Sequence, residues 1–188
     1  MGHPDPDQCG NAAIDLMKEA GIEIANAKCL DMGCGTGLVG VELKKRGFPD
    51  ITGLDASEGM LASAKQKESY TELRHLFLGK PDTYPADLHN RFDIITAAAI
   101  LAQGHLGNEV FDEMLLSLKV GGYAIFTTRE EYLEKYNYNV AIKAHEEAGR
   151  WKRVKEVKFQ KYANIEPGTK IGRYEAKDTM LYAYQKLV

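Results

Sequence analysis

Three glycines alternate with other residues in one short segment, DMGCGTG at residues 31–37, beside a short apolar run that predicts a buried strand at residues 28–32. A glycine-rich loop between a strand and a helix lets the backbone approach a ligand closely, and it presents the N–H groups of the helix N-terminus. The segment therefore favours a ligand-binding loop. A tight strand-to-helix turn without a ligand is the alternative.

Asp31 stands at the end of this predicted buried strand. A buried carboxylate is costly unless a cation or hydrogen-bond donors pair with it. An ammonium group on a ligand can serve as that partner, directly or through water, whereas the pyrophosphate of a dinucleotide would be repelled. The alternative is that Asp31 caps the turn or the helix that follows.

A second acid, Asp55, follows the second predicted strand, 18 residues after Gly37. This spacing is typical of a carboxylate that accepts hydrogen bonds from ribose hydroxyls. It indicates an adenosine ligand without choosing between NAD and S-adenosylmethionine. The alternative role, N-cap of the next helix, can be filled by Ser57.

The dinucleotide fingerprint G-x-G-x-x-G fits the loop only in a poor register. Gly35, Gly37 and Gly40 satisfy it, but the first of them lies two residues beyond Gly33, where the apolar strand stops. A register that starts at Gly33 puts Leu38 at the third glycine position. The loop therefore disfavours a nicotinamide cofactor.

Five strand–helix units are expected to position this loop at the carboxyl end of a mostly parallel sheet. Apolar runs between turn residues predict strands at residues 28–32, 51–54, 73–78, 92–97 and 123–128. Helical periodicity, caps and glycine stops predict helices at residues 11–20, where Asn11 is the expected N-cap, 36–46, 57–67, 108–119 and 130–148.

Two long antiparallel strands are expected after the fifth unit, because residues 154–162 and 179–186 alternate apolar and polar side chains. A loop containing Pro167 and Gly168 joins them. We therefore predict an α/β fold with three layers and a mostly parallel, seven-stranded, Rossmann-like sheet that ends in an antiparallel hairpin. Residues 1–188 are expected to form a single domain, in which residues 1–10 are a disordered tail.

Three segments resemble the motifs of one family. CLDMGCGTG at residues 29–37 and GLDASEGML at residues 53–61 resemble motifs I and II of class I S-adenosylmethionine-dependent methyltransferases. LKVGGYAIFTTR at residues 118–129 resembles the fifth-strand motif of the same family. The resemblance implies the methyltransferase version of the Rossmann-like fold, S-adenosylmethionine as the cofactor and S-adenosylhomocysteine as the product.

The resemblance also implies contacts with each part of the cofactor. Asp31 and the backbone of Gly33, Cys34 and Gly35 would hold the methionine part, and Asp55 would hold the ribose. The remaining implied contacts are Ala56 and Met60 in the adenine slot, Gly79 and Lys80 at the adenine edge, and Ala97 at the methionine end. Lys80 departs from the family, because a lysine cannot accept a hydrogen bond from the adenine amino group; Asp82 or a backbone carbonyl can substitute.

The methyl acceptor is expected beside the fourth and fifth strands. His105 lies in a loop that can close over a substrate, where it can act as a base or orient the acceptor, and Arg129 can bind an acidic group. The alternatives are a surface histidine and an arginine that pairs with Glu130 or Glu131. A methyl transfer needs alignment more than a fixed catalytic residue, so the sequence names none.

Several acceptor classes are disfavoured. No Asn/Asp-Pro-Pro-aromatic motif follows the fourth strand, as amino-methylating nucleic-acid and glutamine enzymes require. The basic run at residues 150–161 can touch RNA, but lysines on an edge strand also discourage aggregation. We expect a small-molecule acceptor, with a protein or RNA methyltransferase and a non-catalytic binding protein as the alternatives.

The composition sets the remaining expectations. A chain of 188 residues that is 44% hydrophobic can bury one core, and a net charge of -3 makes a nucleic-acid partner unfavourable. No apolar run is long enough to span a bilayer. Three cysteines without metal-ligand spacing indicate a reduced, cytoplasmic protein with no metal. We expect a monomer.

Overall fold

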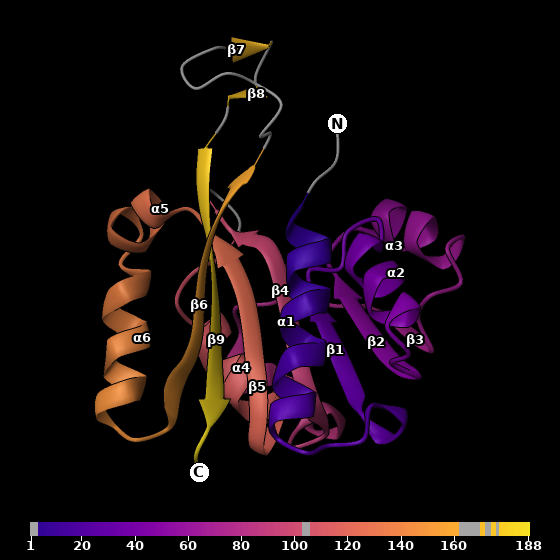
Figure 1. The fold of residues 1–188 in the computed structure, drawn as a ribbon, viewed down its shortest axis with the longest axis horizontal. Helices are drawn as coiled ribbons and strands as arrows, with labels where there is room; N and C mark the ends of the chain where they lie inside the picture. Colours follow the sequence, from indigo (N-terminus) through magenta and orange to yellow (C-terminus); the bar gives the residue numbers. More distant parts are fainter. Residues whose placement is uncertain (1–3, 103–105, 162–169, 172–173, 176) are drawn as a thin grey trace.

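A seven-stranded sheet forms the centre of the structure (Figure 1). The computed structural model describes residues 4–102, 106–161, 170–171, 174–175 and 177–188. In spatial order the strands are β3 (Glu72–His75), β2 (Asp50–Asp55), β1 (Lys28–Met32), β4 (Phe92–Leu101), β5 (Leu118–Thr128), β9 (Lys177–Lys186) and β6 (Trp151–Lys161). The first five pair in parallel, and β9 pairs antiparallel with β5 and β6. The predicted fold class is confirmed, including the C-terminal hairpin.

Helices cover both faces of the sheet (Figure 1). They are α1 (Asp5–Glu19), α2 (Leu38–Lys45), α3 (Glu58–Lys65), α4 (Val110–Ser117), α5 (Glu130–Lys135) and α6 (Tyr138–Glu147), with 3₁₀ turns η1 (Ile24–Asn26), η2 (Pro81–Thr83) and η3 (Ala86–Leu88). A short pair, β7 (Lys170–Ile171) and β8 (Tyr174–Glu175), lies in the β6–β9 connection. In the part of the chain that the structure describes, no helix combines the length and apolarity that a membrane crossing requires.

The central strands separate two apolar clusters, because neighbouring residues of a strand point to opposite faces. Cys29 and Ile94 pack with the buried residues of α1 and α2. The next residue of each strand, Leu30 and Ile95, packs with those of α4 and α6. The central strands are therefore buried on both faces, which explains the continuous apolar runs in their sequence.

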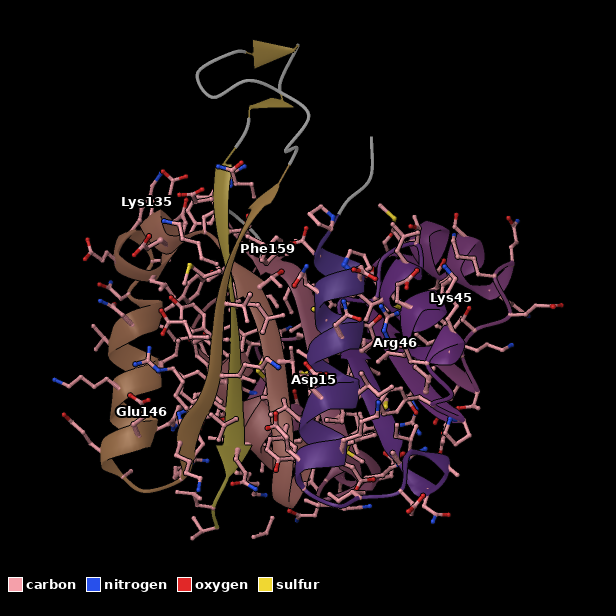
Figure 2. All side chains as sticks on the ribbon, in the orientation of Figure 1. Asp15, Lys45, Arg46, Lys135, Glu146 and Phe159 are labelled. Atoms are coloured by element: carbon pink, nitrogen blue, oxygen red, sulfur yellow. The ribbon has the colours of Figure 1, made fainter. Side chains whose placement is uncertain are left out.

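Helix α1 begins at Asp5, so the expectation of a disordered tail over residues 1–10 is wrong from Asp5 onward, and Asn11 is not the N-cap. Proline is tolerated in a first helical turn, and acids there suit the helix dipole, so the sequence after Pro4 can start a helix. Cys9 is fully buried in the core. Arg46, at the end of α2, reaches across to α1 and donates to Asp7 Oδ1 at 2.6 Å (Figure 2).

The single helix expected over residues 130–148 is two helices. The chain breaks at Asn137, whose φ of 57° lies in the left-handed region that asparagine tolerates better than most residues. The second helix, α6, packs on the core through Tyr138 and Ile142. The loop with Pro167 and Gly168 lies outside the described residues.

Strands β3 and β4 end in different places than predicted. β3 stops at His75, and the backbone N–H of Leu76 then donates to the carbonyl of Asp55 at 3.0 Å. β4 continues beyond Ala97 to Leu101, but the register with β5 shifts after Ala98, and Ala99 has a φ of 60°. Such a bulge redirects the side chains at a strand end, and this one does so at the carboxyl edge of the sheet.

The predicted edge position of the basic run is confirmed, because β6 is the last strand of the sheet. Its cations are partly paired: Lys155 Nζ lies 2.7 Å from Asp15 Oδ2, and Lys158 Nζ lies 2.8 Å from Asp178 Oδ2. These ion pairs reduce the positive charge that a nucleic acid would meet on this strand.

Candidate functional site

Three neighbouring hollows lie along the carboxyl ends of the parallel strands. The first hollow, about 210 Å³, lies beside Gly33, Asp55, Ala56, Leu76, Leu78 and Ile100. The second hollow, about 170 Å³, is lined by Asp5, Pro6, Gly33, Gly35, Ala98 and Ala99, among others. The third hollow, also about 170 Å³, is lined by Asp5, Ala99, Thr127, Arg129, Tyr132 and Thr179, among others. Shared lining residues join the first hollow to the second and the second to the third, as expected for a site at the carboxyl edge of such a sheet.

Two glycines of the loop after β1 shape the first and second hollows. Gly33 has a φ of 69°, and a Cβ there would collide with Cγ2 of Ile100. Gly35 has a φ of 52°, and a Cβ there would meet no atom within 4 Å. The backbone at Gly35 therefore borders open space, so the loop offers a cradle that a ligand can approach closely.

Asp55 fastens the glycine loop to the end of β2. Its Oδ2 accepts from the N–H of Gly35 at 2.8 Å, and its Oδ1 accepts from the N–H of Ser57 at 2.8 Å. Ser57 is the N-cap of α3, where its hydroxyl accepts from the N–H of Met60 at 3.3 Å. An ionised carboxylate has about four acceptor sites, so Asp55 keeps acceptor capacity toward the first hollow.

Asp31 lies behind the loop, with 1% of its surface exposed. Its Oδ1 accepts from the hydroxyl of Thr96 at 2.9 Å, and its Oδ2 accepts from the hydroxyl of Tyr70 at 2.7 Å. Burial raises the pKa of Asp31 to about 7, against the opposing effect of these two hydrogen bonds. The structure thus supplies protein donors to an acid that the sequence assigned to a ligand ammonium, and that assignment stays a prediction.

Tyr70 is a residue that sequence reasoning missed. Its ring fills a slot next to Gly37, Gly40 and Gly53, where a Cβ on any of the three would come within about 3.0 Å of ring atoms or collide with them. Its hydroxyl accepts from the N–H of Gly40 at 3.1 Å while it donates to Asp31. The glycine that completes G-x-G-x-x-G therefore makes room for an aromatic ring, and the isolated Gly53 inside a strand was the available signal.

The expected adenine contacts do not all come together. Ala56 lines the first hollow, along with the apolar Leu76 and Leu78, which the sequence analysis did not name. Met60 is 44% exposed on α3 and is not among the residues that line this hollow.

The backbone N–H groups of Gly79 and Lys80 donate to the buried carboxylate of Glu113 at 2.8–2.9 Å. Burial raises the pKa of Glu113, although these bonds oppose the rise. The carboxylate thereby ties the loop after β3 to α4, and the roles of Met60, Gly79 and Lys80 toward adenine remain predictions.

The methionine end is lined by neighbours of the residue that the sequence named. Ala97 is fully buried within the α4 side of the core. Ala98 and Ala99, at the β4 bulge, line the second hollow, as does Cys34. Burial raises the pKa of the Cys34 thiol far above its usual range, so the thiol stays protonated and contributes only its shape.

Of the two residues predicted to contact the methyl acceptor, the structure describes one. His105 lies outside the described residues. Arg129 lines the third hollow, where its Nη1 donates to the hydroxyl of Tyr132 at 3.2 Å and lies 3.4 Å from Oε1 of Glu131. Thr127, at the end of β5, donates from its hydroxyl to Oδ1 of Asp5 at 2.9 Å. This contact brings the first turn of α1 into the site.

The strand order, the glycine loop after β1 and the acid at the end of β2 define a Rossmann-like nucleoside-binding fold with a C-terminal antiparallel hairpin. Comparison with known families gives the same class. The profile of the family described as methyltransferase domain matches residues 29–122, which is half of the chain. The chain therefore belongs to this methyltransferase family.

Solved structures share the whole fold. An S-adenosylmethionine-dependent methyltransferase from Clostridium acetobutylicum superposes with a TM-score of 0.68 at 14% identity, over 98% of this chain and 93% of that chain. The N-methyltransferase NodS from Bradyrhizobium japonicum, in complex with S-adenosyl-L-homocysteine, gives a TM-score of 0.66 at 17% identity, over 98% and 88%. At these identities the likeness shows the fold.

Curated relatives match a shorter part of their own length. Human methyltransferase-like protein 27 is 33% identical over 130 residues, which cover 67% of this chain and 51% of the relative. Malonyl-[acyl-carrier protein] O-methyltransferase of Bacillus cereus is 26% identical over 175 residues, which cover 92% and 58%. The chain thus spans little more than half the length of these relatives.

Proposed function

We propose that this chain binds S-adenosylmethionine across the first and second hollows and transfers its methyl group to a small molecule in the third. The observation that carries the proposal is the open space next to the backbone of Gly35, whose N–H is held by the Asp55 carboxylate. Gly33, two residues earlier in the same loop, lines both the first and the second hollow. Membership of the methyltransferase family supports the same ligand.

The lining of the hollows fits the parts of this cofactor. The first hollow is apolar at Ala56, Leu76 and Leu78, which suits an adenine ring, and it has the Asp55 carboxylate to accept hydrogen bonds from ribose hydroxyls. The second hollow presents the loop backbone at Gly35, which suits the amino-acid part. When bound, the cofactor supplies a methyl group on a sulfonium, and the protein's task is to align the acceptor and exclude water.

The third hollow supports a small acceptor. It shares Asp5 and Ala99 with the second hollow, so a molecule in it would lie next to the amino-acid end of the cofactor. Its volume of about 170 Å³ suits a small molecule better than a folded macromolecule. Several relatives are named ubiquinone biosynthesis O-methyltransferase, which is in keeping with a small-molecule acceptor.

Within the family, we infer that the chain lies near the methyltransferase-like proteins. Residues 30–48 and the segment TTRE at residues 127–130 are similar to the methyltransferase-like protein of the Williams–Beuren syndrome critical region. The 33% identity with human methyltransferase-like protein 27 supports this placement.

Calorimetric titration tests the cofactor assignment. We expect S-adenosylhomocysteine and S-adenosylmethionine to bind and NAD and NADP to give no heat, because a pyrophosphate in this space would be repelled by the carboxylate of Asp55 at the end of β2. Binding of a nicotinamide cofactor alone would refute the assignment. Transfer of a labelled methyl group into metabolite, protein and RNA fractions then tests the acceptor: label in the metabolite fraction is the expected result, and label confined to protein or RNA would contradict it.

A further inference from the structure

Three polar groups from distant parts of the sequence meet around the third hollow. They are Asp5 in the first turn of α1, Arg129 after β5 and Thr179 in β9. Of these three residues, only Arg129 was predicted from the sequence to contact the methyl acceptor. Together they place an acid, a guanidinium and a hydroxyl around one small space, which restricts the chemistry of the molecule that fits.

Thr179 points to a ligand, because its hydroxyl lacks a hydrogen-bond partner. The side chain is 2% exposed, and within the described part of the chain no atom bonds to its Oγ1. A buried polar atom is normally satisfied, and each exception needs an explanation such as an absent ligand. A molecule in the third hollow that hydrogen bonds to Thr179 would supply the missing partner.

The side chain of Arg129 is held in one orientation by Tyr132, and some of its N–H groups remain available to a ligand. Its guanidinium carbon lies 5.3 Å from the centroid of the Tyr132 ring, and its Nη1 donates to the hydroxyl of the same tyrosine. Among the described residues nothing engages Nε or Nη2. A planar guanidinium whose Nε and Nη2 both have unused N–H groups matches the geometry of a carboxylate.

Asp5 stands where the second and third hollows meet, because it lines both. Its Oδ1 accepts from the hydroxyl of Thr127 at 2.9 Å, and that hydroxyl in turn accepts from the N–H of Ala99 at 3.0 Å. The chain of donors orients Asp5 as a hydrogen-bond acceptor. An anionic group of a ligand would be repelled here, whereas a hydroxyl or an amine would be held.

We propose that the methyl acceptor is a small carboxylic acid that also carries a hydroxyl or amine group. The carboxylate binds Arg129 and Thr179, and the hydroxyl or amine donates a hydrogen bond to Asp5 beside the cofactor's hollow. This inference rests on the proposed function for the identity of the bound molecule as an acceptor. The three polar side chains themselves define the ligand chemistry.

Binding can be measured by NMR titration with 3-hydroxybutyrate, butyrate and neutral 3-hydroxybutyramide as matched probes. We expect saturable shifts at Arg129 and Thr179 with 3-hydroxybutyrate, binding weaker by about tenfold or more for the amide, and intermediate binding for butyrate. Arg129→Gln should remove the preference for the acid, and Thr179→Val should weaken it. Asp5→Ala should make 3-hydroxybutyrate and butyrate equal. Arg153→Gln, on β6, is the matched control and should bind as the wild type does.

Equal binding of the acid and the amide, an unchanged preference in Arg129→Gln, or no binding of any probe would overturn the inference. Calorimetry with S-adenosylhomocysteine separates this outcome from failure of the proposed function. If S-adenosylhomocysteine binds and no probe binds, the acceptor class is wrong and the cofactor site stands. If 3-hydroxybutyrate binds but S-adenosylhomocysteine does not, the anion site stands and the methyltransferase proposal falls.

Discussion

At the scale of single residues, the site depends on one buried acid and the donors around it. Asp31 is enclosed by Thr96 of β4 and Tyr70 of the segment before β3, so three parts of the chain converge on one carboxylate. The negative charge of the nearby Asp55 also raises the pKa of Asp31. The glycine loop follows Asp31 directly in the chain, and Tyr70 also accepts from the N–H of Gly40 at the far side of the loop.

The raised pKa of Asp31 predicts a pH-dependent stability. Because the pKa rises from 3.8 unfolded to about 7 folded, the folded protein holds its proton over that interval while the unfolded chain has lost it. The contribution of Asp31 is therefore complete below about pH 4 and is lost as the pH rises to about 7. Asp31→Asn removes this loss. The free energy of unfolding of the variant minus that of the wild type should therefore increase from about pH 4 to about pH 7 and stay constant above that. Urea denaturation across pH measures the difference, and a constant difference contradicts the shift.

Tyr70→Phe should destabilise the fold without disturbing the glycine slot. The ring stays between Gly37, Gly40 and Gly53, but Asp31 loses a donor and the N–H of Gly40 loses its acceptor. Leaving buried partners unpaired costs about 1–3 kcal/mol.

Denaturation at pH 5 and pH 8 measures this cost, which should be larger at pH 8, where Asp31 is ionised. Tyr123→Phe is a suitable control, because its hydroxyl lies in the same side of the core but meets only Gln185 among the described hydrogen bonds. Equal losses for the two substitutions would count against a special role of Tyr70.

At the scale of elements, α1 belongs to the site as well as to the core. Its first turn lines the second and third hollows through Asp5, and its body packs on α2, β4 and β5. Arg46 ties the helix to α2 through Asp7. A helix that closes two hollows and is fastened at its N-terminal half positions the acceptor side of the site.

Cys9→Asp tests whether this half of α1 is folded. The side chain is fully buried, so a carboxylate there would be an unpaired charge in the core, and a loss of at least about 3 kcal/mol is expected. Gln8→Asp, one position earlier on a more exposed face, should change stability far less. If both substitutions changed the urea midpoint only slightly and by similar amounts, the result would support the expectation that residues 1–10 are a disordered tail.

At the scale of the whole molecule, the sequence predicted the sheet and missed much of what surrounds the ligand space. The buried strands are continuous apolar runs, which local patterns reveal. The start of α1 was hidden by prolines that a first turn accepts, and the helix break at Asn137 by strong periodicity on both sides. Tyr70 and Thr179 reach the site from distant parts of the chain. Such long-range pairs leave no local pattern, so only the fold reveals them.

Because the proposed ligand would contact β1, β2, β4 and α1 together, its binding should stabilise the molecule as a unit. At a concentration of S-adenosylhomocysteine 100 times its Kd, linkage gives about 2.7 kcal/mol, or a rise in Tm of about 5–11 °C for a domain of this size.

Asp55→Asn should weaken binding by about 1–3 kcal/mol, as loss of hydrogen bonds to a charged group does, and so reduce the rise by a third or more at the same ligand concentration. The substitution also loosens the loop at Gly35, so the quantity to compare is the ligand-induced shift and not the Tm itself. Asp15→Asn, on the outer face of α1, is the control with an unchanged shift. A full shift in Asp55→Asn would mean that the carboxylate at the end of β2 only fastens the loop and does not receive the ribose.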